Sequence, residues 1–300
     1  MKNSDSLAAL GENGLLHLLT AHWKTDSSRV LTGVGDDCAI LRGAGKNHFL
    51  IFKTDALVEG VHFTPRERPE LIGRKALARA LSDLAAMGAA PLAAVITLGV
   101  PAGESVRRLR AIYQGIERLA KKHQVNLVGG ETTRVKQLFL NVALLGECRG
   151  YRPALRSGAQ VGDLIFVTGR LGATQARHHL VFEPRLAEGQ WLARHRVASS
   201  LMDLSDGLGA DLPRLARASG VFFQLDFAAI PRARGATLKA ALNDGEDYEL
   251  LFTARPSVAK TLKKKWPFAT PLHCIGVVVP CGEESRESFI AHGFDHFKQR

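Results

Sequence analysis

The chain has 300 residues, of which 46% are hydrophobic and 23% are charged. This balance is typical of a globular protein and excludes disordered and fibrous classes, and the length suffices for two domains of ordinary size. The formal net charge of +11 would suit an anionic ligand or nucleic acid. However, the basic residues are scattered, and the one compact run, Lys263-Lys264-Lys265, is typical of a solvated helix end. We therefore expect no nucleic-acid partner.

The sequence also indicates a cytoplasmic protein without a membrane segment. Its four cysteines form no C-x-x-C pair and have no zinc-like spacing. The first residues lack the apolar core of a signal peptide. The longest uncharged stretch, residues 84–100, contains Gly88 and Pro91 and is too short to span a bilayer comfortably.

The first half of the chain alternates predicted helices and strands. The apolar run 49–52 predicts a buried strand that ends at Thr54-Asp55. Over residues 70–87, apolar side chains recur at helical spacing until Gly88 ends the helix. The other elements expected here are helices over 7–22 and 104–123 and strands over 92–98, 125–128 and 138–145, with a turn at 129–134.

A domain boundary is predicted between residues 148 and 162, where Gly, Arg and Pro occur without periodicity. The predicted domains are therefore residues 1–148 and 149–300. In the second domain we expect strands over 164–168, 221–225, 249–253 and 274–279 and helices over 186–196 and 210–218. Strands that alternate with helices in both halves indicate an α+β protein with two layered α/β domains.

Five short acidic motifs are the strongest functional signal. They are Gly35-Asp36-Asp37, Thr54-Asp55, Ser82-Asp83, Gly129-Gly130-Glu131 and Asp203-Leu204-Ser205-Asp206-Gly207. If folding gathers these carboxylates, their repulsion requires hard cations, and Mg²⁺ with a polyphosphate is the natural answer. The sequence thus predicts ATP chemistry, although it has neither a G-x-x-x-x-G-K-[ST] loop nor a protein-kinase catalytic loop.

Four of the five motifs also have a purely structural interpretation. Asp83 could pair with Arg79 on a helix surface. The other structural readings are a turn at 35–37, a turn or helix cap at 54–55 and an N-cap at 205–206. Asp203 has no such explanation, and five sites together are harder to explain structurally than one.

Seven ordered motifs resemble the thiamine-monophosphate kinase family. They are Gly-Asp-Asp-Cys-Ala at 35–39, Thr-Asp-Ala-Leu-Val-Glu-Gly-Val-His-Phe at 54–63, Leu-Ser-Asp-Leu-Ala-Ala-Met-Gly-Ala at 81–89, Gly-Gly-Glu-Thr-Thr-Arg at 129–134, Arg-Ser-Gly-Ala at 156–159, Met-Asp-Leu-Ser-Asp-Gly-Leu at 202–208 and Gly-Glu-Asp-Tyr-Glu-Leu at 245–250. The resemblance covers about residues 11–297. It implies the fold of the aminoimidazole ribonucleotide synthetase-like superfamily, a homodimer that joins its N-terminal sheets, and an active site between the domains.

The resemblance also implies roles for individual residues. Several Mg²⁺ ions would be held by Asp36, Thr54, Asp55, Asp83, Glu131, Asp203 and Asp206. ATP would contact Gly130, Glu131, Arg156 and Ser205, and thiamine monophosphate would contact His62, Glu246 and Phe294. The implied reaction moves the γ-phosphoryl group of ATP to the phosphate of thiamine monophosphate, whose ionised oxygen needs no protein base. Catalysis would then be electrostatic, through the metal ions and Arg156, and His62 would be a substrate contact.

Some positions depart from the family pattern. Lys53 stands where the family usually has a small hydroxyl residue, and we hypothesise that its ammonium takes the place of one Mg²⁺. Glu131 replaces the usual Asp, and the segments 181–185 and 243–245 also differ. Two alternatives remain open, a same-superfamily enzyme with another acceptor and a non-catalytic nucleotide-binding paralogue. Selenophosphate synthetase and the hydrogenase maturation factor are disfavoured because the chain lacks their characteristic cysteines.

Overall fold

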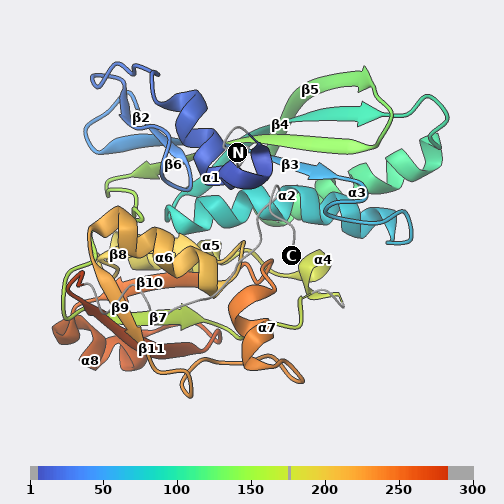
Figure 1. The fold of residues 1–300 in the computed structure, drawn as a ribbon. Helices are drawn as coiled ribbons and strands as arrows, with labels where there is room; N and C mark the ends of the chain where they lie inside the picture. The colour runs from blue at the N-terminus through green and yellow to red at the C-terminus, as the bar shows by residue number, and fades with distance from the viewer. Residues whose placement is uncertain (1–5, 175–176, 283–300) are drawn as a thin grey trace.

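The computed structural model describes residues 6–174 and 177–282 and contains two β-sheets with helices between and around them (Figure 1). The strands of the first sheet are β1 (Val30–Thr32), β2 (Ala39–Arg42), β3 (His48–Val58), β4 (Ala90–Val100), β5 (Asn126–Arg134) and β6 (Phe139–Arg149). Those of the second sheet are β7 (Leu164–Thr168), β8 (Ser200–Asp203), β9 (Phe222–Leu225), β10 (Leu250–Ala254) and β11 (Leu272–Val279). The helices are α1 (Leu7–Thr20), α2 (Pro69–Ala86), α3 (Val106–Lys122), α4 (His178–Val181), α5 (Leu186–Arg194), α6 (Leu208–Ser219), α7 (Leu238–Asn243) and α8 (Pro256–Lys265). The predicted α+β class is confirmed.

The first sheet has the order β1-β2-β3-β6-β4-β5 and two unlike faces. Side chains alternate between the faces of a strand, so Ile51 and Leu57 of β3 are buried on one face, whereas Phe52 is 48% exposed on the other. Helix α2 covers the buried face of β3 and β6, which we call the inner face (Figure 1). The register pairs Phe52 with Leu145 and Lys53 with Leu144 of β6. Consequently Lys53 and Asp55 lie on the inner face and Thr54 lies on the outer face.

Helix α2 is the central element of the molecule. It begins at Pro69, where the missing N–H of proline costs no helical hydrogen bond, and most of its 18 residues are buried. It packs on the first sheet and on α3, and its other side contacts α4, α5 and β8 of the second half (Figure 1). A helix buried on all sides tolerates the small, apolar composition seen here. One continuous hydrophobic core therefore joins both halves through α2.

The second sheet has the order β8-β10-β7-β11-β9, and all of its strand pairs are antiparallel. A second hydrophobic cluster packs α6 and α7 against it. Helix α8 ends in Lys263-Lys264-Lys265, all exposed, so the prediction of a solvated helix end is confirmed. Within residues 6–174 and 177–282, no helix is both long and apolar enough to cross a membrane.

The structure corrects one predicted turn. Residues 129–134 were expected to connect two strands, but they continue β5, which pairs in parallel with β4 along its whole length. Gly130 has a φ of 156°, and a Cβ atom there would lie 1.8 Å from the carbonyl oxygen of Ile96. The two glycines were read as turn signals, whereas at Gly130 glycine permits a close approach of two strands. The strands β1, β2 and β8 and the helices α4, α7 and α8 were not predicted as separate elements.

Candidate active site

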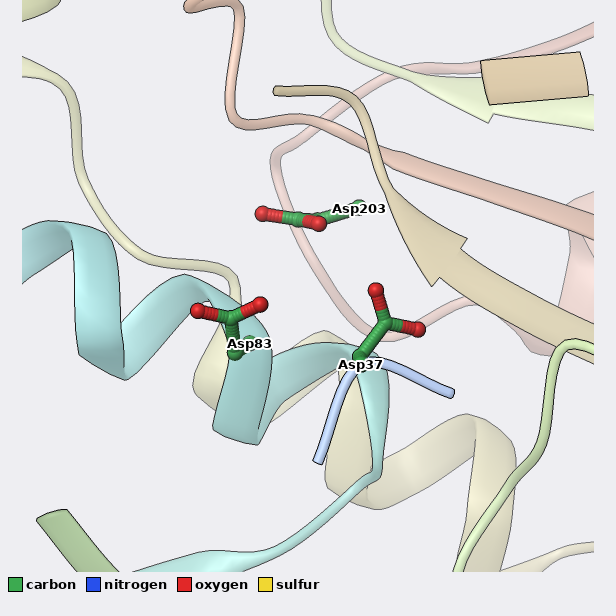
Figure 2. Close-up of side chains that lie close together, drawn as sticks. All are labelled: Asp37, Asp83 and Asp203. Atoms are coloured by element: carbon green, nitrogen blue, oxygen red, sulfur yellow. The ribbon is translucent and has the colours of Figure 1, made fainter. Parts of the chain in front are cut away.

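Three carboxylates from distant parts of the chain meet between the two sheets (Figure 2). Asp37 comes from the loop before β2, Asp83 from α2 and Asp203 from the end of β8, and one oxygen of each lies within 4.8 Å of the others. All three residues are buried. We call them the carboxylate triad. Asp83 and Asp203 were predicted metal ligands, whereas Asp37 was not.

The triad has the electrostatics expected of a cation site. Burial and the charge of Asp37 raise the pKa of Asp203 to about 7. The Ser82 hydroxyl donates a hydrogen bond of 2.6 Å to this carboxylate, which opposes the rise in pKa. Burial likewise raises the pKa of Asp83, although Lys53 opposes the shift. The Oδ2 atom of Asp37 is buried without a hydrogen-bond partner among the described residues. Clustered oxygen ligands with an unsatisfied buried atom fit a hard divalent cation such as Mg²⁺.

Basic side chains of the chain itself balance part of this charge. The ammonium of Lys53 lies 2.9 Å from Asp83, and the guanidinium of Arg156 lies 2.7 Å from Asp37. Burial acts to lower the pKa of Lys53, but Asp83 and then Asp55 attract the ammonium more strongly, so the pKa is raised. The ammonium therefore stays charged beside the triad.

The alternative that Asp83 forms a surface pair with Arg79 is wrong. Arg79 instead pairs with Asp55 at 3.1 Å. The face of α2 that carries Asp83 is turned toward the inner face of β3, which presents Lys53 and Asp55. The packing of α2 on β3 therefore determines that Asp83 pairs with Lys53 and Asp55 pairs with Arg79.

Asp36 lies beside the triad and faces Arg156. Its carboxylate oxygens accept hydrogen bonds from the backbone N–H of Arg156 at 3.3 Å. Burial, followed by the charge of Asp37, raises the pKa of Asp36 to about 6. Of the two neighbouring acids at 36–37, the second enters the triad and the first binds the backbone of the second half.

Asp206 lies outside the triad and forms an ion pair with Arg214. Its backbone N–H donates to Asp211 at 3.0 Å, and Asp211 lies 2.7 Å from the same guanidinium. The suggested N-cap at 205–206 is wrong, because the N-cap of α6 is Gly207 with a φ of 99°. Ser205 lies in the same loop, and its carbonyl oxygen accepts a hydrogen bond from the backbone N–H of Glu246 at 2.7 Å.

Thr54, Gly130 and Glu131 lie away from the triad. The Thr54 hydroxyl donates to Asn141 across the outer face at 2.9 Å, and Glu131 is exposed on the edge strand β5. Three strand spacings, or about 14 Å, separate β3 from β5 in the sheet. Within one chain, the structure therefore brings neither Thr54 nor Glu131 together with Asp83 and Asp203.

Two of the predicted substrate contacts are linked through a residue that the sequence analysis did not single out. The ammonium of Lys75 donates to the carbonyl oxygen of His62 at 2.7 Å and lies 2.6 Å from the carboxylate of Glu246. Lys75 lies eight positions before Asp83 on α2. Its position among the buried apolar residues of this helix could have drawn attention to it in the sequence. Phe294, the third predicted contact, lies outside the described residues.

The raised pKa values predict that Mg²⁺ stabilises the protein more at high pH. A carboxyl group whose pKa is raised by folding stabilises the protein at low pH, and this contribution is lost as pH rises through its folded pKa. The loss begins near the ordinary pKa of 3.8 and is complete above about pH 6 for Asp36 and above about pH 7 for Asp203. A shift of this size at Asp203 corresponds to about 4 kcal/mol at most. Mg²⁺ favours the ionised carboxylates and should offset the loss.

The measurement is the melting temperature with and without MgCl₂ at about pH 5.5 and about pH 8. We expect the increase caused by Mg²⁺ to be clearly larger at the higher pH. Calcium-free NaCl of matched ionic strength is the control for screening. An equal increase at both pH values would contradict the assignment of these carboxylates to a cation site.

Comparison with known proteins gives a consistent result over most of the chain. The family model "AIR synthase related protein, N-terminal domain" matches residues 35–148. A thiamine-monophosphate kinase from Buchnera aphidicola subsp. Acyrthosiphon pisum is 33% identical over 89% of this chain and 93% of its own length. That from Salmonella typhimurium is 36% identical over 82% of this chain and 83% of its own length.

The fold agrees as well. A solved structure of AaThiL complexed with AMPPCP and TMP superposes with a TM-score of 0.84 at 29% identity, and the match covers 96% of this chain and 97% of that one. The seven motifs, the two-sheet fold and these relatives lead to one conclusion. This chain belongs to the thiamine-monophosphate kinase family.

Proposed function

We propose that this protein uses ATP to phosphorylate thiamine monophosphate to thiamine diphosphate. The observation that carries the proposal is the carboxylate triad with Arg156 beside it, placed where the two halves of a thiamine-monophosphate kinase fold meet. Family membership supports the substrate pair, since the solved structure of AaThiL is a complex with AMPPCP and TMP. In this reaction the acceptor is a phosphate oxygen that is already ionised, so positioning and charge neutralisation are the main requirements.

The residues of the triad have a common role in this proposal. Asp37, Asp83 and Asp203 would hold Mg²⁺, which when bound neutralises charge on the transferring phosphoryl group. Arg156 is anchored by Asp37 and would place its remaining N–H donors toward the nucleotide phosphates. We also propose that Asp36, Asp55 and Asp206 support the cation site and that Ser205 contacts ATP. None of these side chains needs to act as a base.

A homodimer joined through the outer face of the first sheet is part of the proposal. Phe52 and Val95 are exposed on this face by 48% and 39%, and Val128 of the edge strand β5 is exposed by 62%. Exposed apolar side chains on one sheet face are typical of an interface. Thr54, Gly130 and Glu131 would then bind metal or ATP only in the assembled dimer.

The proposed division into domains 1–148 and 149–300 is supported by the two sheets. The last strand of the first sheet ends at Arg149, and the first strand of the second sheet begins at Leu164.

The test of the function is thiamine diphosphate formation by the purified protein with ATP, Mg²⁺ and thiamine monophosphate. We expect one ADP per thiamine diphosphate, with no product when EDTA replaces Mg²⁺. ATP binding without product would contradict the proposal and favour another acceptor. Omission of thiamine monophosphate controls for background ATP hydrolysis.

Lys53 should lower the number of divalent ions that the site binds. Its partly buried ammonium already lies 2.9 Å from Asp83, where it occupies part of the space and charge that a cation would take. We predict that Lys53→Ser raises the number of Mn²⁺ ions bound per chain by about one in the presence of a non-hydrolysable ATP analogue. Electron paramagnetic resonance counts the bound ions independently of activity.

Lys46→Ser is the matched control, because Lys46 is an exposed lysine in the loop between β2 and β3 and forms no ion pair with Asp37, Asp83 or Asp203. This variant should bind the wild-type number of ions. An unchanged ion count in Lys53→Ser would show that the ammonium does not stand in for a metal ion.

A further inference from the structure

Lys75 is a lysine with no exposed surface in the middle of the molecule. Its side chain is among the largest that are fully buried in the part of the chain that the structure describes, and it extends from α2 toward the second half. The ammonium contacts three groups, namely the carbonyl oxygen of His62 at 2.7 Å, Nδ1 of His179 at 2.8 Å and a carboxylate oxygen of Glu246 at 2.6 Å. We call this set of four residues the Lys75 cluster.

The contacts satisfy the ammonium completely. An ammonium has three N–H donors, and the cluster offers three acceptors when Nδ1 of His179 is unprotonated. Burial, followed by the charge of Lys75, lowers the pKa of His179 and favours that neutral state. A fully buried charge with all donors satisfied is rarely more stabilising than well-packed apolar side chains. The Lys75 cluster therefore suggests a role other than stability.

The cluster fixes the orientation of Glu246. This residue has a φ of 57°, in the left-handed region, and its backbone N–H is held by the carbonyl oxygen of Ser205. One carboxylate oxygen, Oε1, is turned inward by Lys75 and by the Tyr248 hydroxyl at 3.3 Å. The side chain nevertheless remains 30% exposed. Lys75 and Tyr248 thus hold the Glu246 carboxylate on its buried side, and part of the side chain stays accessible to solvent.

The position of the cluster relates it to the triad. Ser205, which holds the backbone of Glu246, follows Asp203 by two residues. Lys75 and Asp83 lie two helical turns apart on α2, so both charged groups point from one helix into the junction of the two halves. A molecule whose phosphate lies at the triad could therefore extend toward Glu246.

We infer that Lys75 is a positioning residue that presents the Glu246 carboxylate to the cationic, amino-bearing organic part of the phosphate acceptor. This inference rests on the proposed function, since thiamine monophosphate combines a phosphate with a thiazolium cation and an aminopyrimidine. A carboxylate binds both a cation and an N–H donor. Lys75 itself touches no substrate in this arrangement and acts through Glu246.

The alternative is that the Lys75 cluster only ties the two halves together. Such a tie would affect stability and would change the kinetic constants for both substrates. A positioning role instead predicts a loss confined to the acceptor and carried entirely by Glu246. A double-mutant cycle separates these cases, because residues that act through one contact give non-additive effects.

The experiment compares Lys75→Met, Glu246→Gln and the double variant in the thiamine diphosphate assay. We expect each single variant to raise the KM for thiamine monophosphate about tenfold, a change of about 1.4 kcal/mol in binding. The double variant should be no worse than Glu246→Gln alone. The KM for ATP should change less than about twofold in all three variants.

Arg74→Met is the matched control. Arg74 is the neighbour of Lys75 on α2 and pairs with Glu183 of the second half at 3.2 Å, so its loss breaks a tie between the halves without touching Glu246. This variant should lower the melting temperature and leave the KM for thiamine monophosphate unchanged. If Lys75→Met does not fold, His179→Leu, which removes one acceptor of the ammonium, should raise that KM about threefold.

Additive effects of Lys75→Met and Glu246→Gln, or an equal rise in the KM for ATP, would overturn the inference while the wild-type activity stands. Calorimetric binding of thiamine monophosphate to the same variants gives a second readout. Wild-type protein that binds thiamine monophosphate without phosphorylating it would contradict the proposed function, and the binding cycle would still decide the role of Lys75. Wild-type protein that does not bind it at all would overturn both.

Discussion

Asp203→Asn will abolish most of the phosphoryl transfer and yet stabilise the metal-free protein. Asparagine has nearly the shape of aspartate and can still accept the hydrogen bond of the Ser82 hydroxyl. The substitution removes one of three carboxylate charges within 4.8 Å, and with it much of the attraction for a divalent cation. We expect kcat/KM to fall at least about 100-fold, equivalent to about 3 kcal/mol of lost transition-state stabilisation.

The stability of this variant changes in the opposite direction. Asp203 is buried beside Asp37, and the pKa of about 7 shows that its charge is unfavourable in the folded state. A neutral amide avoids this repulsion, so the melting temperature of the EDTA-treated protein at about pH 8 should rise. A folding defect would lower both activity and stability. Steady-state kinetics and thermal unfolding of the same preparation distinguish these outcomes.

Asp163→Asn is the matched control. Asp163 is also buried, but its carboxylate accepts a hydrogen bond from the backbone N–H of Gln160 in the turn before β7, outside the triad. This substitution should leave kcat/KM within about twofold of wild type. Equal losses in Asp163→Asn and Asp203→Asn would show that buried charge in general, rather than the triad, supports activity.

Much of the fold could be predicted from hydrophobic periodicity. The helices α2 and α3 and the strands β4 and β6 have long, regular patterns, and they lie close to their predicted bounds. Short elements such as β1 and α7 were missed because three to six residues give too few repeats of a period. The glycines at 129–130 misled the prediction, since sequence does not distinguish a glycine needed for a turn from one needed for strand contact.

The site could be predicted only in part, because charge partners depend on the tertiary fold. The motifs directed attention to Asp83 and Asp203, which the fold brings together. Which of Asp36 and Asp37 points inward depends on the backbone at Gly35, whose φ is 119°. Lys53 and Arg156 were placed near the carboxylates only through the family resemblance, because they pair with Asp83 and Asp37 across 30 and 119 residues of sequence. Local sequence carries no record of such contacts.

Gly73→Ala will destabilise the protein at the crossing of α2 and α3. A Cβ atom at Gly73 would lie 1.8 Å from the carbonyl oxygen of Ile112, far inside van der Waals contact. The reciprocal contact is equally close, since a Cβ atom at Gly115 would lie 1.9 Å from the carbonyl oxygen of Glu70. The backbone of each helix therefore packs directly against a glycine of the other helix. An alanine forces the helices apart in a close-packed core, at a cost of about 3 kcal/mol or more.

The intrinsic preference of helices for alanine over glycine opposes this effect by only about 1 kcal/mol, so steric overlap determines the sign. We expect a melting temperature lower by roughly 5–10 °C. Gly103→Ala is the control, because a Cβ atom there meets no atom within 4 Å and the backbone is not left-handed. Since α2 also carries Lys75 and Asp83, separation of the helices should weaken binding of both Mg²⁺ and thiamine monophosphate. A Gly73→Ala protein as stable as Gly103→Ala would mean that α3 can move away from α2 at little cost.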